Sequence, residues 1–224
     1  MEPAAGTEGA WSGDRTLRAV VPTILACVAL AGCAGSLLES KSEAPEIYRL
    51  DGAQSAAPPR AAAASPASLG VTRPRAATSL DTERIAVVQP GSRFDYYAGV
   101  RWSEAAPEML QRRLVQALSA DGSFAAVVAV PSRVPPDLFL DLELRRFEAA
   151  YASAGAPPRV RVEVQATLVD GRRLGRVASF RASSEAAAAA DTRRSVIAAF
   201  EEATDDAVRQ VIEGVRPHAP VAGR

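Results

Sequence analysis

Alternation of apolar and polar residues is most regular in the second half of the chain, where it predicts long strands. In residues 137–144, leucines at every second position alternate with two aspartates, a glutamate and Phe139. Residues 159–169 repeat this period of two with valines, an alanine and a leucine on one face. Such a period places one face of each strand in a core. Phe147 has the opposite parity to the leucines, which predicts a bulge or a change of side after Leu144.

An Asp-Gly pair follows the second of these strands and predicts a hairpin. Residues 170–173, with the sequence DGRR, form a turn into a third strand over 174–183, so the three strands make an antiparallel set. Shorter strands are predicted earlier in the chain, because β-rich pieces there are separated by turn residues as in a meander. These pieces are residues 46–52, 69–75, 84–89, 93–102 and 123–130.

The period changes to that of an amphipathic helix in two segments. One helix is expected from near Pro107 to Gly122, because proline fits only in the first turn of a helix. A second helix is expected from about Thr192 to Val215, with Gly214 and Pro217 at its end. The apolar positions at helical spacing are Leu110, Leu114, Ala117 and Leu118 in the first, and Val196, Phe200, Ala203, Ala207, Val211 and Val215 in the second.

This order of elements predicts an α+β fold in the form of a two-layer α/β sandwich. We expect a mostly antiparallel sheet with the two main helices packed on one face and the other face partly open. Before the sheet, residues 53–68 consist almost entirely of alanine, proline and serine, a composition that predicts a flexible linker.

Residues 20–38 form an apolar run that holds both cysteines of the chain. The run contains no charge, so a transmembrane helix is one interpretation. Its strongly apolar part, residues 20–30, is only eleven residues long and follows Arg15 and Arg18, which is typical of an export signal. Export is therefore favoured over a transmembrane helix.

The end of this run, Leu-Ala-Gly-Cys at residues 30–33, resembles the lipobox of bacterial lipoproteins. Cleavage before Cys33 would leave its thiol to receive a diacylglyceryl group, and Cys27 would be discarded with the signal peptide. The alternative is that Cys33 is only a small apolar residue in a hydrophobic segment. Ala34, rather than aspartate, follows the cysteine, which by resemblance to sorting in diderm bacteria implies retention at the outer membrane.

The predicted organisation of the chain follows from these features. Residues 1–32 form a lipoprotein signal peptide, and residues 33–68 hold the lipidated N-terminus, a short strand and the Ala/Pro-rich linker. Residues 69–216 form the folded α/β domain, and residues 217–224 form a disordered tail. Acidic residues at 2, 8 and 14 are unusual in a signal peptide, so the true start can lie downstream of Met1.

Charge and cysteine content exclude several classes of function. Lysine plus arginine equals aspartate plus glutamate, at 26 each, so no net field favours nucleic-acid binding. No cysteine follows Cys33, and the folded domain therefore has no internal disulfide and no cysteine-ligated metal.

Candidate catalytic groups are few. The only histidine, His218, lies in a proline-bounded tail where nothing would fix its geometry. Asp137, Asp141 and Glu143 share a strand face at a spacing that suits an acid pair or a divalent cation, but a solvated face balanced by nearby arginines explains them better. We expect no enzymatic activity, no cofactor and no metal site. A second acidic cluster, on the last helix, is formed by Glu201, Glu202, Asp205 and Asp206.

Residues 93–102 form the densest aromatic patch in a chain that is only 5% aromatic. Trp102 stands beside a predicted helix start and is expected in the core, whereas Phe94, Tyr96 and Tyr97 are candidate contacts with a partner. Adjacent strand residues point to opposite faces, so one of the two tyrosines is expected to be exposed.

Six motifs follow one another along the chain: LGVTRPR, LDTERIAVV, FDYYAGVRW, PEMLQRRLVQAL, DGSFAAVV and LFLDLELRRFE. In this order they resemble the auxiliary lipoproteins of ABC-type lipid transporters, the PqiC-like family, from about Leu69 to Val215. The resemblance implies a small periplasmic domain fastened to a membrane. It also implies work with an Mce-type substrate-binding protein and an ABC permease and ATPase that move phospholipids or other hydrophobic molecules across the cell envelope.

Two other functions stay open from the sequence. A stand-alone periplasmic lipid carrier would need an apolar pocket of roughly 300–1,000 Å³. A lipoprotein activator of a cell-wall enzyme would need only a docking surface. The sequence also leaves open a homo-oligomer and the surface that contacts the transporter.

Overall fold

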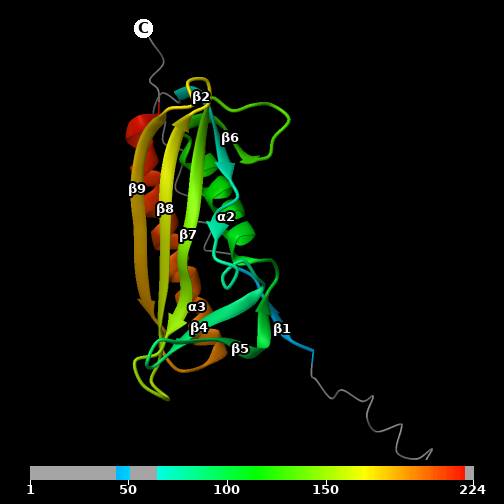
Figure 1. Ribbon diagram of the computed structural model, residues 1–224, viewed down its shortest axis with the longest axis vertical. Coiled ribbons are helices and arrows are strands. Elements are labelled where there is room, and N and C mark those ends of the chain that lie inside the picture. The colour runs from blue at the N-terminus through cyan, green and yellow to red at the C-terminus, as the bar shows by residue number, and fades with distance from the viewer. Residues whose placement is uncertain (1–43, 51–64, 220–224) are drawn as a thin grey trace, which may run out of the picture. The chain divides into compact units, whose positions relative to one another are not determined.

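The computed structural model describes residues 44–50 and 65–219 (Figure 1). From Pro45 onward these residues belong to one compact unit, Pro45–Arg224. The predicted signal peptide, Cys33 and residues 53–64 of the predicted linker lie outside the described residues, as do the last five residues of the predicted tail.

Strand β7 (Leu138–Ala150) is the longest strand of the sheet, and its two edges are built differently. One edge pairs antiparallel with β8 (Arg159–Asp170), which in turn pairs antiparallel with β9 (Arg176–Ala187). This confirms the predicted antiparallel set. The pairing of β7 with β8 shifts between Leu144 and Arg146, and Phe147 is buried, so the predicted bulge is confirmed.

The other edge of β7 pairs with three short strands, all of them parallel to it. They are β2 (Ser65–Thr72), β3 (Arg75–Ala76) and β4 (Arg84–Gln89). Beyond β2, the strand β6 (Phe124–Val130) adds in parallel. Beyond β4 comes β5 (Arg93–Trp102), antiparallel, and then β1 (Glu46–Tyr48), parallel to β5.

The sheet is therefore mixed, and the expectation of a mostly antiparallel sheet is wrong. Among the described strands, five of the eight pairings are parallel. Parallel neighbours need a crossover connection, and here a hairpin and a helix separate β2 from β6 along the chain. An alternating pattern marks a strand but carries no information on which distant strand becomes its neighbour.

The start of the sheet also differs from the prediction, because β2 begins inside the stretch expected to be linker. Ser68 donates from its backbone N and its Oγ to Asp137 Oδ2, at 3.0 and 2.9 Å. Leu69 and Val71 are fully buried. The last four residues of the predicted linker are thus held in the sheet beside β7.

Both predicted helices are present and cover one face of the sheet (Figure 1). Helix α2 (Ala106–Asp121) has Pro107 in its first turn and ends at Gly122, whose φ of 71° lies in the left-handed region. Helix α3 (Arg193–Val215) is capped by Thr192, which accepts from Ser195 N. A short 3-10 turn, η1 (Arg216–His218), follows α3.

The core between the sheet and the helices is closed by three aromatic rings. The ring of Trp102 on β5 lies 5.8 Å from that of Phe147 on β7 and 5.1 Å from that of Phe200 on α3. All six residues predicted for the apolar side of α3 are buried. Trp102 is 0% exposed, which confirms its predicted place in the core.

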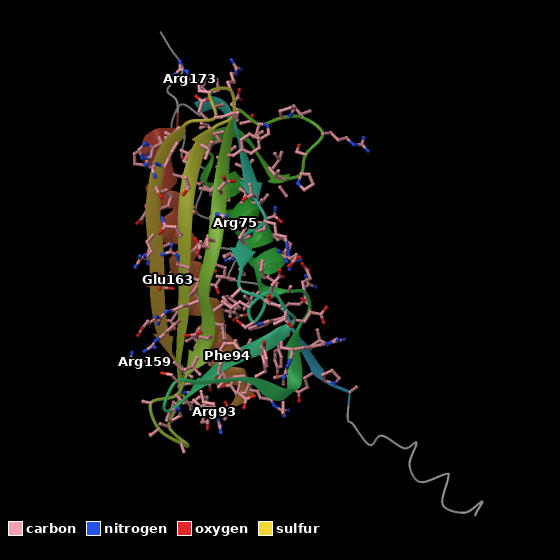
Figure 2. The ribbon with its side chains drawn as sticks, in the orientation of Figure 1. Arg75, Arg93, Phe94, Arg159, Glu163 and Arg173 are labelled. Atoms are coloured by element: carbon pink, nitrogen blue, oxygen red, sulfur yellow. The ribbon has the colours of Figure 1, made fainter. Side chains whose placement is uncertain are left out.

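The opposite face of the sheet, called the outer face below, carries charged side chains along β7, β8 and β9 (Figure 2). Glu163 on β8 lies between Arg146 and Arg181, with nitrogen to oxygen distances of 3.6 and 3.5 Å. This face matches the expected alternation, in which one side of each strand is solvated.

Candidate interaction surface

The strand that carries the predicted aromatic contacts is bent where it leaves the β4–β5 hairpin. Ala86 of β4 pairs with Tyr96, but Arg84 pairs with Arg101, so extra residues bulge out of β5. Gly99 lies in this bulge with a φ of 70°, a conformation that glycine adopts without strain. The bulge lets the first half of β5 present side chains on the outer face while Trp102 enters the core.

On the outer face, Phe94 and Tyr96 form an edge-to-face pair with ring centroids 5.3 Å apart. The guanidinium carbon of Arg84 lies 3.7 Å from the centroid of the Tyr96 ring, a cation–π contact. The Tyr96 hydroxyl donates to Ser79 O at 3.1 Å. These three side chains, Arg84, Phe94 and Tyr96, are called the β5 patch. Its members hold one another in place, and Phe94 remains 41% exposed.

Tyr97 points to the other side of β5, toward the helices. Its hydroxyl lies 2.8 Å from that of Tyr151, which donates to Asp191 Oδ1 at 2.6 Å, so Tyr97 donates to Tyr151. Burial, together with the Asp191 carboxylate, raises the pKa of Tyr151, and burial raises the pKa of Tyr97. Both phenols therefore stay neutral and act as hydrogen-bonding groups.

The prediction for the tyrosine pair is thus only partly right. Tyr96 and Tyr97 do point to opposite faces, but both are half-buried and neither is exposed. Of the three predicted contact residues, Phe94 and Tyr96 come together on the outer face, and Tyr97 is separated from them. Arg84 was not predicted as part of this surface, because its place beside Tyr96 follows from the pairing of Ala86 with Tyr96 across the hairpin.

The outer face beside the β5 patch contains a half-buried carboxylate. Glu148 of β7 pairs across the sheet with Ala86 on one side and with Arg161 on the other. Burial raises the pKa of Glu148, and the charges of Arg146 and Arg161 act in the opposite direction. Figure 2 places Phe94 near Arg93 and Arg159 at this end of the sheet. The surroundings of the patch therefore contain both arginines and carboxylates.

Of the acidic residues predicted at positions 137, 141 and 143, the first and last are engaged in contacts within the fold. Asp137 accepts from Ser68, and Arg172 Nη2 lies 3.1 Å from its other oxygen. The Ser68 hydrogen bonds, followed by Arg172, lower the pKa of Asp137. Glu143 lies 3.4 Å from Arg145, and Asp141 is exposed. Within residues 44–50 and 65–219, no three histidine, cysteine, aspartate or glutamate side chains gather as metal ligands.

One member of the acidic cluster on α3 links the two helices. Asp205 accepts from Arg113 of α2 at 2.7 Å, and these side chains are only 31% and 14% exposed. Asp206 pairs with Arg209 one turn along α3. His218 is exposed in η1. In the described residues, none of these side chains contacts the β5 patch.

Two cavities bear on the carrier alternative. The apolar one lies between β5 and α3, and holds only about 10 Å³, about the space of one water molecule. The larger one, of about 510 Å³, is open to solvent beside β3. Arg75, Glu143 and Arg145 line it, and these charged groups do not suit an acyl chain. Neither cavity has the size and the apolar lining that a lipid carrier needs.

None of the helices described here has the length and apolarity needed to cross a membrane.

Solved structures resemble the fold closely. A crystal structure of a DUF330-family protein from Xanthomonas campestris matches with a TM-score of 0.64 and 25% identity, over 78% of this chain and 95% of that protein. A second, of an uncharacterised protein, matches with a TM-score of 0.60 and 12% identity, over 77% of this chain and 99% of that one.

No curated protein matches the chain. The family described as "ABC-type transport auxiliary lipoprotein component" matches residues 48–212, which span the strands from β2 to β9 and all but the last residues of α3. This match confirms the resemblance noted in the motifs, and it associates the chain with the cell envelope. The chain belongs to the family of ABC-type transport auxiliary lipoprotein components.

Proposed function

We propose that the chain is a non-catalytic subunit of an Mce-type transporter, lipidated at Cys33 and held at the periplasmic face of the outer membrane. It would work with an Mce-type substrate-binding protein and an ABC permease and ATPase that move phospholipids or other hydrophobic molecules. The family membership supports the transport role, and the lipobox at residues 30–33 supports the anchor.

The filled core is the observation that carries this proposal. Trp102, Phe147 and Phe200 occupy the space between sheet and helices, and the apolar cavity between β5 and α3 holds about 10 Å³. A protein that enclosed its cargo would need a far larger apolar space. A domain of this kind contributes through its surface, which favours a subunit that binds another component of the transporter over a stand-alone carrier.

The β5 patch is the surface we assign to that contact. Rigid aromatic side chains with an adjacent arginine are typical of residues that dominate binding energy at protein interfaces. Arg84, Phe94 and Tyr96 are already fixed by contacts with one another, so little side-chain freedom is lost when a partner binds. The patch also lies on the side of the sheet where β1 follows the predicted anchor in the chain.

Binding of the full chain, extracted from membranes in detergent, to the purified Mce-type protein tests this assignment. Phe94→Ala with Tyr96→Ala is expected to weaken binding about tenfold or more, as loss of a central aromatic pair does. Val134→Ala is the matched control, because Val134 is 73% exposed in the loop before the opposite end of β7. Equal loss in both variants, or no binding by the unaltered chain, would contradict the proposal.

The same preparation separates the alternatives. Co-isolation with a peptidoglycan synthase instead of the transporter would indicate an activator of a cell-wall enzyme. Cys33→Ala is expected to release the chain from membranes, and mass spectrometry of the unaltered protein is expected to find an acylated N-terminus beginning at Cys33. A mature chain with an unacylated N-terminus would rule out the anchor.

A further inference from the structure

The turn between β8 and β9 carries basic and apolar side chains together at the end of the sheet opposite the β5 patch. The hairpin tip, as it is called here, consists of Arg172, Arg173, Leu174, Arg176 and Val177. Leu174 is 80% exposed and Val177 is 43% exposed. Figure 2 places Arg173 at the far end of the strands from Phe94 and Arg93. The predicted hairpin is confirmed, but its left-handed residue is Leu174.

Leu174 is exposed at a cost in folding free energy. Its φ of 52° lies in the left-handed region, which disfavours a residue with a side chain by roughly 1–2 kcal/mol. The backbone holds this conformation, because Leu174 N donates to Asp170 O at 2.8 Å and Asp170 N donates to Gly175 O at 2.9 Å. A leucine that is 80% exposed gains little from packing within the described fold, and its side chain is accessible to another surface.

The hairpin tip is also fixed on the body of the domain. Gly171 N donates to Asp137 O at 2.8 Å. A Cβ added at Gly171 would lie 2.8 Å from Pro136 O and 2.9 Å from the Phe139 ring, so the turn rests directly on the start of β7. The exposed side chains therefore stand on a rigid base.

The acids at the base of the tip accept hydrogen bonds from the fold, and the three arginines of the tip are exposed. Asp170 accepts from the backbone N of Arg172 and of Arg173, both at 2.9 Å. Arg172 pairs with Asp137 but is 85% exposed. In the described parts of the chain, Arg173 and Arg176 have no carboxylate within ion-pair distance. The outward surface of the turn is therefore basic and apolar, without an exposed acid of its own.

We propose that the hairpin tip docks on the surface of a bilayer that contains anionic phospholipid. The guanidinium groups would contact the phosphates, while Leu174 and Val177 enter the interfacial layer. A stable protein interface takes about 20–30 residues from each side, and a five-residue tip falls far short of that. A weak contact is enough for a protein that already belongs to the envelope, because tethering gives a high effective concentration.

The tip lies far from the strand that follows the predicted anchor. The anchor predicted at Cys33 precedes β1, and β1 pairs with β5 beside the C-terminal end of β7. The tip lies at the N-terminal end of β7, about 40 Å away for a strand of this length. The tip and β1, the first described strand after the predicted anchor, therefore lie at opposite ends of β7. We place the docking on a bilayer other than the one that holds the anchor; this step alone rests on the proposed anchor.

Vesicle capture by the full chain tests the docking. The chain is reconstituted in phosphatidylcholine nanodiscs, which are immobilised and exposed to vesicles of phosphatidylcholine alone or with phosphatidylglycerol. Capture of the anionic vesicles only, reduced by high salt, is the expected result. Arg172→Gln with Arg173→Gln and Arg176→Gln is expected to lower capture about tenfold or more, since each arginine near a membrane contributes about 1 kcal/mol. Leu174→Asn is expected to lower capture severalfold.

The matched control removes three positive charges from the outer face, away from the tip. It combines Arg145→Gln, Arg146→Gln and Arg181→Gln, and we expect it to capture anionic vesicles as the unaltered chain does. Equal capture of neutral vesicles, or equal loss in both triple variants, would overturn the proposal, as would no capture by the unaltered chain. If soluble polyglutamate competes away vesicle capture, and Leu174→Asn captures vesicles as well as the unaltered chain does, the partner would be an acidic protein instead of a bilayer. Incorporation of the chain into the nanodiscs tests the anchor, so a failure of the proposed anchor is distinguished from a failure of docking.

Discussion

The two ends of β7 both carry exposed apolar side chains beside arginines, but they are built in opposite ways. In the β5 patch each side chain has a partner, because Arg84 covers Tyr96 and Phe94 meets Tyr96 edge to face. At the hairpin tip the guanidinium groups of Arg173 and Arg176 have no carboxylate within ion-pair distance in the described residues, and Leu174 is strained. A preorganised patch suits a specific protein partner, whereas unpaired arginines suit a diffuse array of phosphates.

The largest expected effect on stability distinguishes a core aromatic residue of β5 from a surface one. Trp102→Ala is expected to lower the free energy of unfolding by about 3–5 kcal/mol, because it leaves a cavity against Phe147 and Phe200. Phe94→Ala, on the same strand, is expected to cost less than about 1 kcal/mol, because the ring is largely outside the core. Urea unfolding followed by far-ultraviolet circular dichroism, a signal of the backbone, measures the free energy of unfolding of both variants. Similar costs for the two variants would show that Phe94 belongs to the core.

At the hairpin tip, the base of the turn is expected to be the sensitive point. Gly171→Ala is expected to cost about 1–3 kcal/mol, because its Cβ would press on backbone and on the Phe139 ring. Gly175→Ala is the matched control in the same turn, where an added Cβ meets nothing within 4 Å. Thermal unfolding of both variants provides the comparison. A neutral Gly171→Ala would mean that the tip is not seated on β7.

Leu174→Asn is expected to stabilise the fold by up to about 1 kcal/mol, because asparagine tolerates the left-handed region better than leucine. The same change is expected to weaken vesicle capture. A gain in stability with a loss of binding is the sign of a residue kept for function. If the unfolding midpoint in urea falls instead, the leucine side chain contributes to packing and the interpretation of the tip is wrong.

Arg84→Ala is expected to cost about 0.5–1 kcal/mol, the usual size of an exposed cation–π contact. Its effect on partner binding should be larger than its effect on stability, because it frees the Tyr96 ring. Arg101→Ala is a suitable control, since Arg101 pairs with Glu83 on the same edge and does not touch Tyr96 in the described contacts. Equal binding by the two variants would remove Arg84 from the β5 patch.

The smallest effect concerns the acid that supports the hairpin tip. The pKa of Asp137 is lowered in the folded state, so its contribution to stability is present above the ordinary value near 3.9 and is lost as pH falls through the folded value. Asp137→Asn should therefore lower the unfolding midpoint at neutral pH and approach the unaltered chain in acid. A constant difference at every pH would show that the carboxylate charge is not involved.

The features that the sequence predicted well are local ones. The alternation in β7 and β8, the bulge after Leu144 and the buried side of α3 all depend on residues close together in the chain. The end of α2 at Gly122 follows equally directly from a residue that accepts the left-handed region. Such features are set by steric and solvation effects within a few residues, and a single sequence contains that information.

The features that it missed depend on distant partners. The parallel pairing of β2 with β6 and with β7 follows from how crossovers pack, and no pattern inside β2 specifies it. The β5 patch was predicted in part, since Phe94 and Tyr96 were named, but Arg84 joins them from the neighbouring strand through the pairing of Ala86 with Tyr96. One local feature was also missed, the left-handed conformation of Leu174, because an Asp-Gly pair makes the glycine the usual left-handed residue of a hairpin turn.

Native mass spectrometry of the chain purified from membranes gives the most direct test that this domain works through its surface and encloses no cargo. The packed core predicts a mass equal to the mature acylated polypeptide, with no further lipid bound in a fixed ratio. One phospholipid retained per chain, and lost when the fold is melted, would contradict a filled core and make the chain a lipid carrier.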